Sequence, residues 1–429
     1  MTQGTLIGYE INERACQISF YNEMESEPNT MEAGSDHDYI PLCVGKLRDT
    51  WVYGKDAIRL TKVKEGFAAT RLLERGLSEE VLEHGAESYD AVWLLSKFVQ
   101  LTLEGFKNSI EGIVFSVPVL SEELANLLRT VALNLNIPKN RIFVQDYKES
   151  FCNYLFYQPK ELWQYESVLF SCDRSEIKAY VMRRLRTGLG DGKTTFVVVD
   201  EISNDQFRDA PYIYPVLDEI RAKEADKQLS KFVERVFLGR TVSSVYLTGS
   251  GFVGNWFPSS LRLICNGRRA FMGNNLYSKG ACFTAYRKTF MRLEDPIYLS
   301  DDKLTEQISI SMRVDGQEVW HPIVSWGAYW YESNGQWNVL LRDVKDMELH
   351  IESLVAADVR TETISLENFP KRVEYSMRAQ IEIFFLDKHT CKITVRDMGF
   401  GEFFSQSDFK EEKIIQLGGS NGKLDSLSL

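Results

Sequence analysis

The stretch Ser243-Ser-Val-Tyr-Leu-Thr-Gly-Ser-Gly-Phe-Val-Gly254 decides the fold prediction for this chain. Its first half predicts a short buried strand, Val245–Leu247, that runs directly into a glycine-rich turn. Gly249, Gly251 and Gly254 allow backbone angles that other residues avoid, and they let a ligand or a second backbone segment approach closely. Ligands bind at such strand ends in open α/β sheets, although a tight turn without a ligand is the commoner outcome.

A second informative stretch lies upstream and predicts a strand–helix–strand unit. Gly112–Pro118 is an almost wholly apolar run, of the kind that is buried on both faces of a parallel sheet. Ser121 is a good helix N-cap, and apolar residues follow it at helical spacing over Leu124–Leu135 until Pro138 ends the helix. Arg141–Val144 is a second strand, so the two strands form a parallel pair.

The remaining elements of the first 290 residues follow from alternation, apolar runs and caps. Toward the N-terminus we expect two strands, Thr5–Glu10 and Ala15–Tyr21, followed by a polar surface loop, Glu23–Asp38. Two strand pieces, Tyr39–Val44 and Thr50–Tyr53, come next, and a helix capped by Asp90 follows them. Downstream we expect a short helix, three strands and three helices: Ser150–Tyr157, Ser167–Ser171, Ile177–Met182, Thr195–Val199, Val216–Leu238, Asn255–Cys265 and Tyr277–Thr289.

Beyond Asp295 the pattern changes to strict alternation of apolar and polar residues. Asp315-Gly316 and Asn334-Gly335 are hairpin-turn dipeptides, and Lys388-His389 separates two further alternating runs. This pattern predicts an antiparallel, sandwich-like domain without a long amphipathic helix. The polar segment Gly418–Leu429 predicts a disordered tail.

Composition narrows the class of protein. The net charge is -11, which argues against nucleic-acid binding because phosphate contacts need concentrated Lys and Arg. No apolar run is long enough to cross a bilayer, and the first residues lack the pattern of a signal peptide. Seven scattered cysteines without Cys-x-x-Cys spacing indicate buried, reduced thiols. We therefore expect a cytoplasmic protein that binds neither nucleic acid nor membrane.

The order of the elements resembles the actin and 70-kDa heat-shock chaperone superfamily, bacterial members included, over about Leu6–Thr289. That family has two lobes, each with a hairpin, a third strand and βα crossovers, and binds a Mg-nucleotide between them. Ile7–Asn12 and the stretch from Val168–Phe170 onward resemble the family's two phosphate hairpins, and Ile113–Pro118 with Leu133–Asn136 resembles its connecting segment. Leu247–Phe252 resembles its adenosine motif, and Gly280-Ala281 resembles the pair of residues that opens its last helix. Ala379–Phe384 and Lys392–Asp397 are similar to two strands of the chaperone's peptide-binding domain.

The resemblance implies an α/β chain with a two-lobed, actin-like (ribonuclease H-like) ATPase fold, followed by an all-β antiparallel, sandwich-like domain. The boundaries that follow are 1–160 for lobe I with a subdomain inserted at about 36–108, 161–290 for lobe II with a shortened adenine-clamp subdomain, 295–412 for the β-rich domain and 413–429 for a flexible tail.

The residues at that family's chemical positions differ in this chain. Glu10 holds the first aspartate position, and Asn12 stands where a glycine belongs. Ser171 holds the second aspartate position, and Cys172–Ser175 replaces a glycine triplet whose N–H groups would cradle phosphate. Asp146, at the catalytic glutamate position, is a shorter acid. Catalysis tolerates little misplacement of such groups, so efficient hydrolysis of ATP is not expected.

We therefore expect a chaperone-like or actin-like protein with a degenerate nucleotide cleft and weak or absent ATPase activity, a pseudo-ATPase that acts mainly by binding a partner protein or peptide. Two alternatives remain: an active ATP-dependent, chaperone-like ATPase that uses Glu10, Asp146 and Asp173, and a structural protein that binds no nucleotide. The implied cofactor is ATP or ADP with Mg. The candidate nucleotide-binding residues are Asn12, Arg14, Arg174, Ser175, Gly249, Gly251, Phe252 and Gly280.

Several other patterns in the sequence have a simple structural interpretation beside a functional one. Gly188–Thr194 matches the end of a phosphate-binding loop, but a strand follows it instead of a helix, so a hairpin turn is expected. Met398–Phe404 could form a peptide-binding rim, while a turn with its aromatic side chains in the core is the simpler expectation. Four tryptophans are likewise expected in the core, namely Trp320, Trp326, Trp330 and Trp337. The five histidines share no metal-ligand spacing, so no metal site is predicted.

Overall fold

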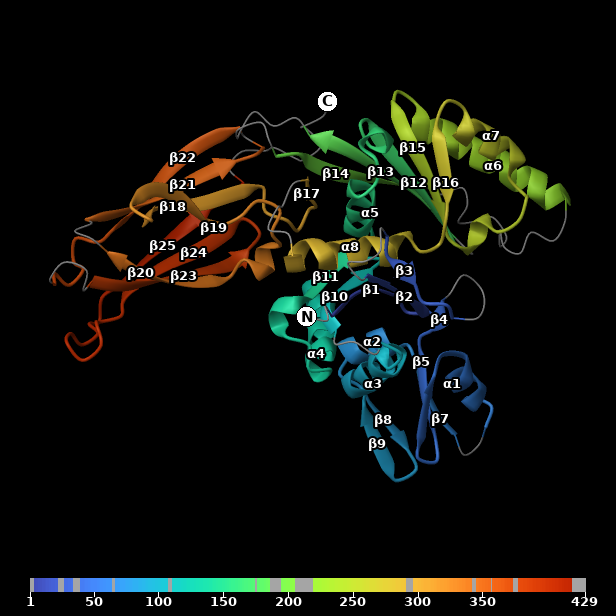
Figure 1. Cartoon of the computed structure of the whole chain (residues 1–429), viewed down its shortest axis with the longest axis horizontal. Helices are drawn as coiled ribbons and strands as arrows, with labels where there is room; N and C mark the ends of the chain where they lie inside the picture. Colours follow the sequence, from blue (N-terminus) through green and yellow to red (C-terminus); the bar gives the residue numbers. More distant parts are fainter. Residues whose placement is uncertain are drawn as a thin grey trace. The chain divides into compact units, whose positions relative to one another are not determined.

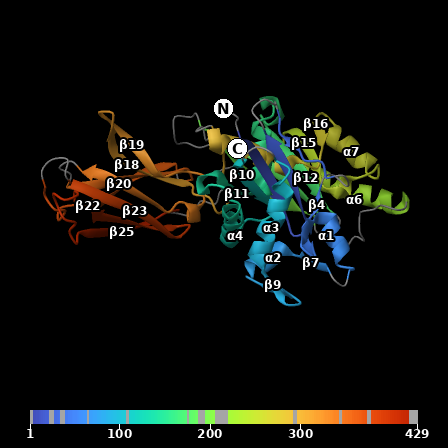
Figure 2. The same cartoon turned by 60° about the horizontal axis from the view of Figure 1, so that its bottom comes forward.

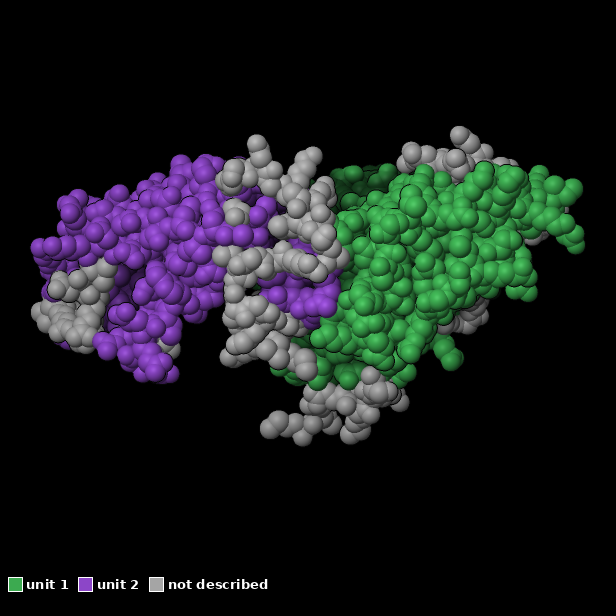
Figure 3. Space-filling view, turned by 90° about the horizontal axis from the view of Figure 1, so that it is seen from above, with its two compact units in different colours: residues 1–183, 199–294 green, residues 184–198, 295–429 purple. Residues whose placement is uncertain are grey.

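The computed structural model describes residues 4–21, 27–33, 39–63, 66–106, 110–173, 176–185, 194–204, 219–290, 296–341, 345–355, 357–372 and 377–418. The chain is a mixed α/β protein with several sheets and a β-rich C-terminal part. It divides into two units, residues 1–183 with 199–294 and residues 184–198 with 295–429, which Figure 3 colours separately. No helix among the described residues has both the length and the apolar character needed to cross a membrane.

The first sheet of unit 1 is built around a hairpin and a parallel pair (Figure 1). β1 (Thr5–Ile11) pairs antiparallel with β2 (Ala15–Tyr21) and parallel with β10 (Ile110–Val117). β10 in turn pairs parallel with β11 (Ile142–Asp146), which confirms the predicted parallel pair. The short β3 (Asn29–Thr30) extends the sheet beyond β2, inside the segment that was expected to be a loop.

Helices on this sheet begin where their caps predict. α3 (Ala91–Leu103) begins after Asp90, whose side chain accepts a hydrogen bond from the Trp93 N–H, and α4 (Glu122–Asn134) begins after Ser121, which accepts from the Leu124 N–H. Both helices bury their apolar faces in the same core as the sheet. The smaller elements between β3 and α3 are β4 (Ile40–Pro41), β5 (Cys43–Leu47), β6 (Thr50–Tyr53), α1 (Gly54–Leu60), β7 (Gly66–Thr70), α2 (Leu72–Leu77), β8 (Val81–His84) and β9 (Glu87–Asp90).

The second sheet, which lies in unit 1 except for the end of β13 and the start of β14, repeats the topology of the first. Its order, β14-β13-β12-β15-β16, matches β3-β2-β1-β10-β11, with an antiparallel hairpin at the centre and two parallel strands beside it. The strands are β12 (Glu166–Cys172), β13 (Ile177–Leu185), β14 (Phe196–Ser203), β15 (Val242–Thr248) and β16 (Arg269–Met272). The last strand was not predicted from the sequence.

Two helices pack on this second sheet, and two others lie beside the first. α6 (Glu219–Phe237) and α7 (Pro258–Cys265) share one apolar core with β12, β13 and β15. α5 (Tyr147–Phe156) and α8 (Leu276–Phe290) pack against each other, and α8 also lies on β1. α5 begins three residues earlier than predicted, because the Asp146 side chain accepts from the Glu149 N–H and acts as the cap.

Unit 2 is a two-sheet antiparallel sandwich, as the alternation predicts. One sheet has the order β19-β18-β21-β22 and the other β20-β23-β24-β25, and their facing side chains form one core. The strands are β18 (Glu306–Val314), β19 (Gln317–Val324), β20 (Gly335–Leu341), β21 (Asp346–Ser353), β22 (Asp358–Ser365), β23 (Met377–Asp387), β24 (Thr390–Asp397) and β25 (Lys410–Gln416). The short β17 (Ile297–Tyr298) pairs in parallel with Phe196–Val197, the first residues of β14.

The turn predictions in unit 2 had different outcomes. Asp315-Gly316 is the β18–β19 turn, and Lys388-His389 separates the paired strands β23 and β24, so both are confirmed. Asn334-Gly335 is not a hairpin turn, because the segment before it is the 3-10 helix η6 (Trp330–Glu332), and β20 pairs instead with the distant β23. The Asn334 side chain accepts a hydrogen bond from the Phe385 N–H, which holds β20 against that distant strand.

The predicted end of the β-rich domain and the predicted burial of Trp320 need correction, and some other predicted segments lie outside the described residues. β25 continues to Gln416, four residues beyond the predicted end of the β-rich domain at 412. Trp320 is 46% exposed and stacks on His350, so its assignment to the core was wrong. The other three tryptophans are half-buried. Residues 186–193 and 419–429 lie outside the described residues, and they contain most of the predicted turn Gly188–Thr194 and of the predicted tail Gly418–Leu429. Residues 205–218, with the first residues of the predicted helix Val216–Leu238, lie outside them as well.

Candidate functional site: tyrosines between two hairpins

Glu10 sits at the end of the buried strand β1 and is itself buried, with 2% of its surface exposed. Side chains alternate along a strand, so Glu10 points away from the face on which the neighbouring Tyr9 lies. Tyr9 packs against Phe115 and hydrogen-bonds the Thr102 hydroxyl in the core of the first sheet. Glu10 is therefore placed on the opposite face of the sheet.

Two tyrosine hydroxyls are the hydrogen-bond donors to this carboxyl. The Tyr147 hydroxyl donates to Glu10 Oε1 at 3.0 Å, and the Tyr39 hydroxyl lies 3.3 Å from the same oxygen. Oε2 has no hydrogen-bond partner among the described residues. Burial raises the pKa of Glu10 to about 8, and the two tyrosines only partly oppose this. The carboxyl is therefore mostly protonated at neutral pH.

A stacked pair of rings continues from this carboxyl toward the second hairpin. The rings of Tyr147 and Tyr277 lie 3.9 Å apart between centroids and are inclined by only 10°. Burial raises the Tyr277 pKa well above 10, and the side chain of Ser171 acts in the opposite direction. Glu10, Tyr147 and Tyr277 thus form a row that begins at the end of β1. Tyr277 lies near Ser171 at the end of β12, but its hydroxyl has no hydrogen-bond partner among the described residues. We call Tyr39, Tyr147 and Tyr277 with Glu10 the tyrosine cluster.

The segment before α8 is hydrogen-bonded to both halves of unit 1. The Tyr39 hydroxyl, besides facing Glu10, lies 3.1 Å from the Asn274 carbonyl oxygen, and Asn274 Oδ1 accepts from the Gly249 N–H at 2.9 Å. Asn275 Nδ2 donates to Thr30 Oγ1 at 2.9 Å. These bonds connect the glycine turn after β15 with the first sheet.

The glycine turn itself is closed by protein backbone. Gly249 has a φ of 102°, and a Cβ there would lie 2.0 Å from the Cys172 carbonyl oxygen. A Cβ at Gly251 would lie 2.3 Å from Cys172 Sγ. Phe252 is buried in the core of the second sheet, and Trp256 Nε1 donates to the Gly251 carbonyl. The close approach that these glycines permit is made by the second hairpin.

The polar candidates in the two hairpin turns serve local structure. Asn12 Oδ1 accepts from the N–H groups of Arg14 and Ala15 and so closes the first turn, where the Arg14 side chain is exposed. Exposed Asp173 accepts from the Glu176 N–H in the second turn. Residues 174 and 175, the candidates Arg174 and Ser175, lie outside the described residues.

Asp146 and Gly280, candidates from the helical elements, also have structural positions. Asp146 caps α5 through the Glu149 N–H. Gly280 lies in the second turn of α8 and does not open the helix, which corrects the prediction. A Cβ there would lie 2.0 Å from the Ser150 carbonyl oxygen, so Gly280 permits the close crossing of α8 and α5. The described residues contain no group of three His, Cys, Asp or Glu that could hold a metal ion.

Charged residues lie close to the tyrosine cluster, on α5 and the second sheet. Glu201 on β14 pairs with Lys148 at 3.0 Å and with Lys178 at 3.2 Å. Although burial would raise the pKa of Glu201, the two lysines hold it below its ordinary value. Burial and the neighbouring Glu201 raise the pKa of Tyr180 on β13.

Sequence reasoning missed the three tyrosines and this ion-pair group. Tyr39, Tyr147 and Tyr277 are separated by more than one hundred residues each, and the chain contains 19 tyrosines. No spacing rule distinguishes these three from the others. The one usable signal was the acidic residue at the end of an otherwise apolar strand, which marked Glu10 but not its partners.

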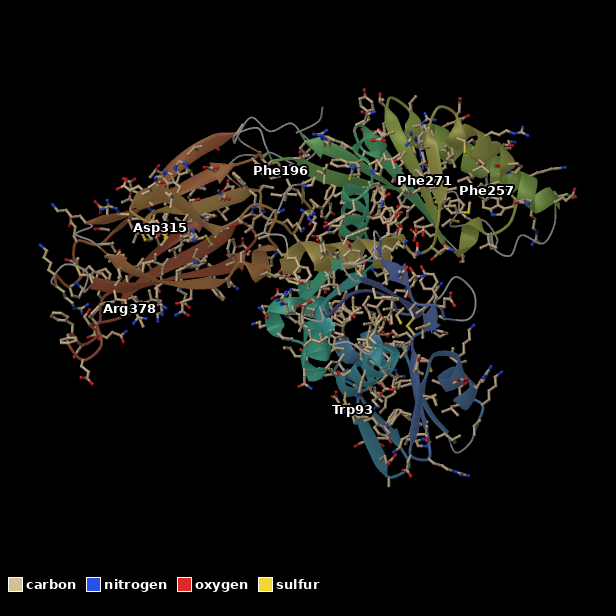
Figure 4. The ribbon with its side chains drawn as sticks, in the orientation of Figure 1. Trp93, Phe196, Phe257, Phe271, Asp315 and Arg378 are labelled. Atoms are coloured by element: carbon tan, nitrogen blue, oxygen red, sulfur yellow. The ribbon has the colours of Figure 1, made fainter. Side chains whose placement is uncertain are left out.

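A separate groove of about 580 Å³ lies on the first half of unit 1, beside α3 and the end of α4. Trp93 on α3, labelled in Figure 4, is 44% exposed at its rim. The groove is lined by Trp93, Ser96, Lys97, Gln100, Leu103, Glu104, Ile110, Asn134, Leu135 and Asn136. It combines one large aromatic surface with charges of both signs.

A family model described as "Family of unknown function (DUF5716) C-terminal" matches residues 25–301, more than half of the chain. The chain belongs to the DUF5716 family. A second model, described as "Domain of unknown function (DUF8552)", matches residues 303–417, which contain the eight strands of the sandwich. No curated protein matches the chain. Within this DUF5716 member the tyrosine cluster falls in the first matched region, with the exception of Glu10.

Proposed function

We propose that this DUF5716 protein is a non-catalytic member of the actin and chaperone superfamily that binds no nucleotide and acts by binding a partner protein. The repeated sheet order, β3-β2-β1-β10-β11 and β14-β13-β12-β15-β16, supports the two-lobed part of this proposal. Each lobe would have a central hairpin with parallel strands beside it, which is the arrangement that the resemblance implies.

The observation that carries the proposal is the row Glu10–Tyr147–Tyr277, which ends near Ser171. The resemblance expects a metal-binding carboxylate at the end of each hairpin, with a Mg-nucleotide between. In this chain Tyr147 donates to Glu10 at the first hairpin and stacks on Tyr277, with ring centroids 3.9 Å apart, and Tyr277 lies near Ser171 at the second hairpin. We infer that the protein's own side chains occupy the space in which the resemblance places a phosphate chain.

The chemistry of the remaining groups also fits Mg-nucleotide poorly. A metal ion needs ionised carboxylate oxygens, whereas burial keeps the Glu10 carboxyl protonated up to a pH of about 8. Ser171 supplies no charge on the other side, the Gly249 N–H already donates to Asn274 Oδ1, and Gly251 lies close against Cys172. We therefore derive no catalytic step through a nucleotide.

Thermal unfolding with and without millimolar Mg-ATP or Mg-ADP tests the proposal. We expect no change in the melting temperature. A ligand present well above its dissociation constant stabilises the native state by a few kcal/mol, so an upward shift of several degrees would contradict the proposal. ATP hydrolysis that disappears in Glu10→Ala and Asp146→Ala would instead establish the enzyme alternative.

The groove beside Trp93 is the first surface to test for the partner-binding part of the proposal. Trp93→Glu would place a charge on its aromatic rim, and Val119→Glu is a matched control because Val119 is 76% exposed before the other end of α4. We expect proteins captured from the source cells by the wild type and the control to be lost with Trp93→Glu. Equal capture by all three chains would exclude this surface.

A further inference from the structure

The sandwich of unit 2 has four edge strands, β19, β22, β20 and β25. An edge strand carries a row of unpaired backbone N–H and C=O groups, which can pair with another chain. Proteins usually protect such edges with charged side chains, proline, bulges or a covering segment. The four edges of this sandwich differ sharply in that protection.

Two of the edges protect each other on one side of the sandwich. The Lys413 ammonium on β25 pairs with Glu362 on β22 at 2.7 Å and donates to the Thr363 carbonyl at 2.8 Å. Arg360 on β22 donates to the Gln416 carbonyl on β25. These cross-sheet bonds occupy β22 and β25 and surround them with charge.

The third edge, β19, is interrupted by its own sequence. Pro322 lies within the strand and lacks an N–H, and the pairing with β18 shifts by one residue near Ile308. Glu318 and His321 are exposed on the same strand. A regular ladder with a further strand is therefore disfavoured there.

The fourth edge, β20, has none of these features. Its sequence, Gly335-Gln-Trp-Asn-Val-Leu-Leu341, contains no charged residue and no proline. All seven residues pair with β23 on one side, and no backbone hydrogen bond between described residues occupies the other side. Figure 2 labels β20, β23 and β25, and in their sheet β20 and β25 are the two opposite edges.

The side chains of β20 are also incompletely covered. Trp337, Val339 and Leu341 point into the sandwich, yet they are only half-buried. On the outer face, Leu340 is 58% exposed opposite Arg378, which Figure 4 labels. A further strand beside β20 would cover the inward row of apolar residues.

We propose that β20 is a self-association edge that pairs antiparallel with β20 of a second copy of this chain. Antiparallel pairing of identical strands brings like residues together around a two-fold axis, and like charges directly opposite one another are destabilising. β20 is the edge on which this penalty is absent, whereas β25 would oppose its own charges, Lys410, Glu411, Glu412 and Lys413.

A two-fold axis through Asn338 gives the most complementary pairing register between the two β20 strands. Trp337 then faces Val339 of the second copy on the inner side, and Gln336 faces its Leu340 on the outer side. The two Asn338 side chains meet at the axis, where each Nδ2 can donate to the other amide, whose oxygen also accepts from Gln380 Nε2 at 3.5 Å in its own chain. The two four-stranded sheets become one continuous sheet. This inference needs only the sandwich and is independent of the proposed function.

Sedimentation of the full chain over a range of micromolar concentrations tests the inference. We expect a dimer for the wild type and a dissociation constant about tenfold or more weaker for Asn338→Lys, because the two ammonium groups would face each other. Thr361→Lys, at an exposed position on β22, is the matched control and should leave the dimer unchanged. A monomeric wild type, or a dimer that Asn338→Lys leaves intact, would overturn the inference.

Cysteine scanning tests the register directly. Gln336→Cys, Asn338→Cys and Leu340→Cys are made one at a time at exposed positions of β20, with the exposed Cys265 replaced by serine. Identical residues at the axis come within disulfide distance, so we expect mild oxidation to link Asn338→Cys most completely. Thr361→Cys should give no linked dimer. Equal linkage at Thr361 and at all three β20 positions would contradict pairing through β20.

Discussion

Glu10 in unit 1 and Asp397 in unit 2 are both buried carboxyl groups, but their environments are opposite. Asp397, with none of its surface exposed, receives four hydrogen bonds: two from Arg372, both at 2.6 Å, and one each from the N–H groups of Gly399 and Ser407. Among the described residues, the hydrogen-bond donors to Glu10 are neutral tyrosine hydroxyls.

The pKa values of the two groups follow from that difference. Burial raises the pKa of Glu10 to about 8, since the hydrogen bonds from Tyr147 and Tyr39 only partly oppose the cost of burying its charge. Burial would also raise the pKa of Asp397, but Arg372 and the two N–H groups outweigh it and hold the pKa well below its usual range. Burial alone therefore does not determine the charge state of a carboxyl, because the number and charge of its donors decide the sign of the shift.

The largest effect is expected from Asp397→Asn. The substitution leaves the buried Arg372 guanidinium without its counter-charge, and removing one partner of a buried pair costs roughly 3–5 kcal/mol of unfolding free energy. Urea unfolding followed by tryptophan fluorescence measures this cost. Asp408→Asn, at an exposed position nearby, is the control.

The contribution of Asp397 to the unfolding free energy should fall as the pH falls. Because its folded pKa is depressed, the stabilisation is present above the unfolded pKa of about 4 and is lost as the pH falls toward the folded value. Stability of Asp397→Asn within about 1 kcal/mol of the control at neutral pH would show that the pair contributes nothing net.

At Glu10 the unfolding free energy should change with pH in the opposite direction from that at Asp397, and Glu10→Gln should remove this dependence. The folded protein keeps a proton on Glu10 up to a pH of about 8, while the unfolded chain releases it near 4.5, so wild-type stability falls as the pH rises between these values. Glutamine mimics the neutral acid, and the variant should therefore match the wild type in mild acid and exceed it by a few kcal/mol near pH 8.

Thermal unfolding at several pH values measures the effect of Glu10→Gln. The exposed Glu83→Gln provides a control for the loss of one negative charge. A wild type whose stability is constant over this pH range, or a Glu10→Gln variant that follows the wild type at every pH, would show that Glu10 is ionised and compensated in the folded protein.

The smallest effect is expected from Tyr39→Phe. It removes one hydroxyl that faces Glu10 Oε1 and the Asn274 carbonyl, and a single hydrogen bond contributes about 1 kcal/mol. A double-mutant cycle that combines Tyr39→Phe with Glu10→Gln measures the coupling between the two side chains. The losses in unfolding free energy of two groups in one hydrogen-bond network do not simply add. Additive losses in unfolding free energy would mean that the Tyr39 hydroxyl acts mainly on Asn274.

Local features were predicted well wherever the signal lies within a few residues. Asp90 and Ser121 cap helices as predicted, since a cap depends only on the side chain and the next turn. The alternating runs on either side of Lys388-His389 form β23 and β24 for the same reason. The six buried cysteines agree with the expectation of buried thiols, with Cys265 as the exposed exception.

Features that depend on distant partners were predicted poorly. Asn334-Gly335 has the composition of a hairpin turn, but the distant strand β23 competes successfully for β20. Asp146 was considered for a catalytic position, whereas its side chain caps the helix that follows. Trp320 belongs to an alternating strand, but the sandwich core does not extend to it.

By itself the sequence determined the order of most of the longer strands and helices, two helix caps and the change to a β-rich C-terminal part, but not short strands such as β3 and β16. Periodicity and capping depend on residues within one or two turns of backbone, so the local sequence is enough to predict these elements. The tertiary structure alone decided that Tyr39 and Tyr147 contact Glu10, that Tyr277 stacks on Tyr147, and that Gly249 approaches Cys172. Those contacts depend on how sheets and helices pack across more than one hundred residues, and no local pattern encodes which side chains then meet.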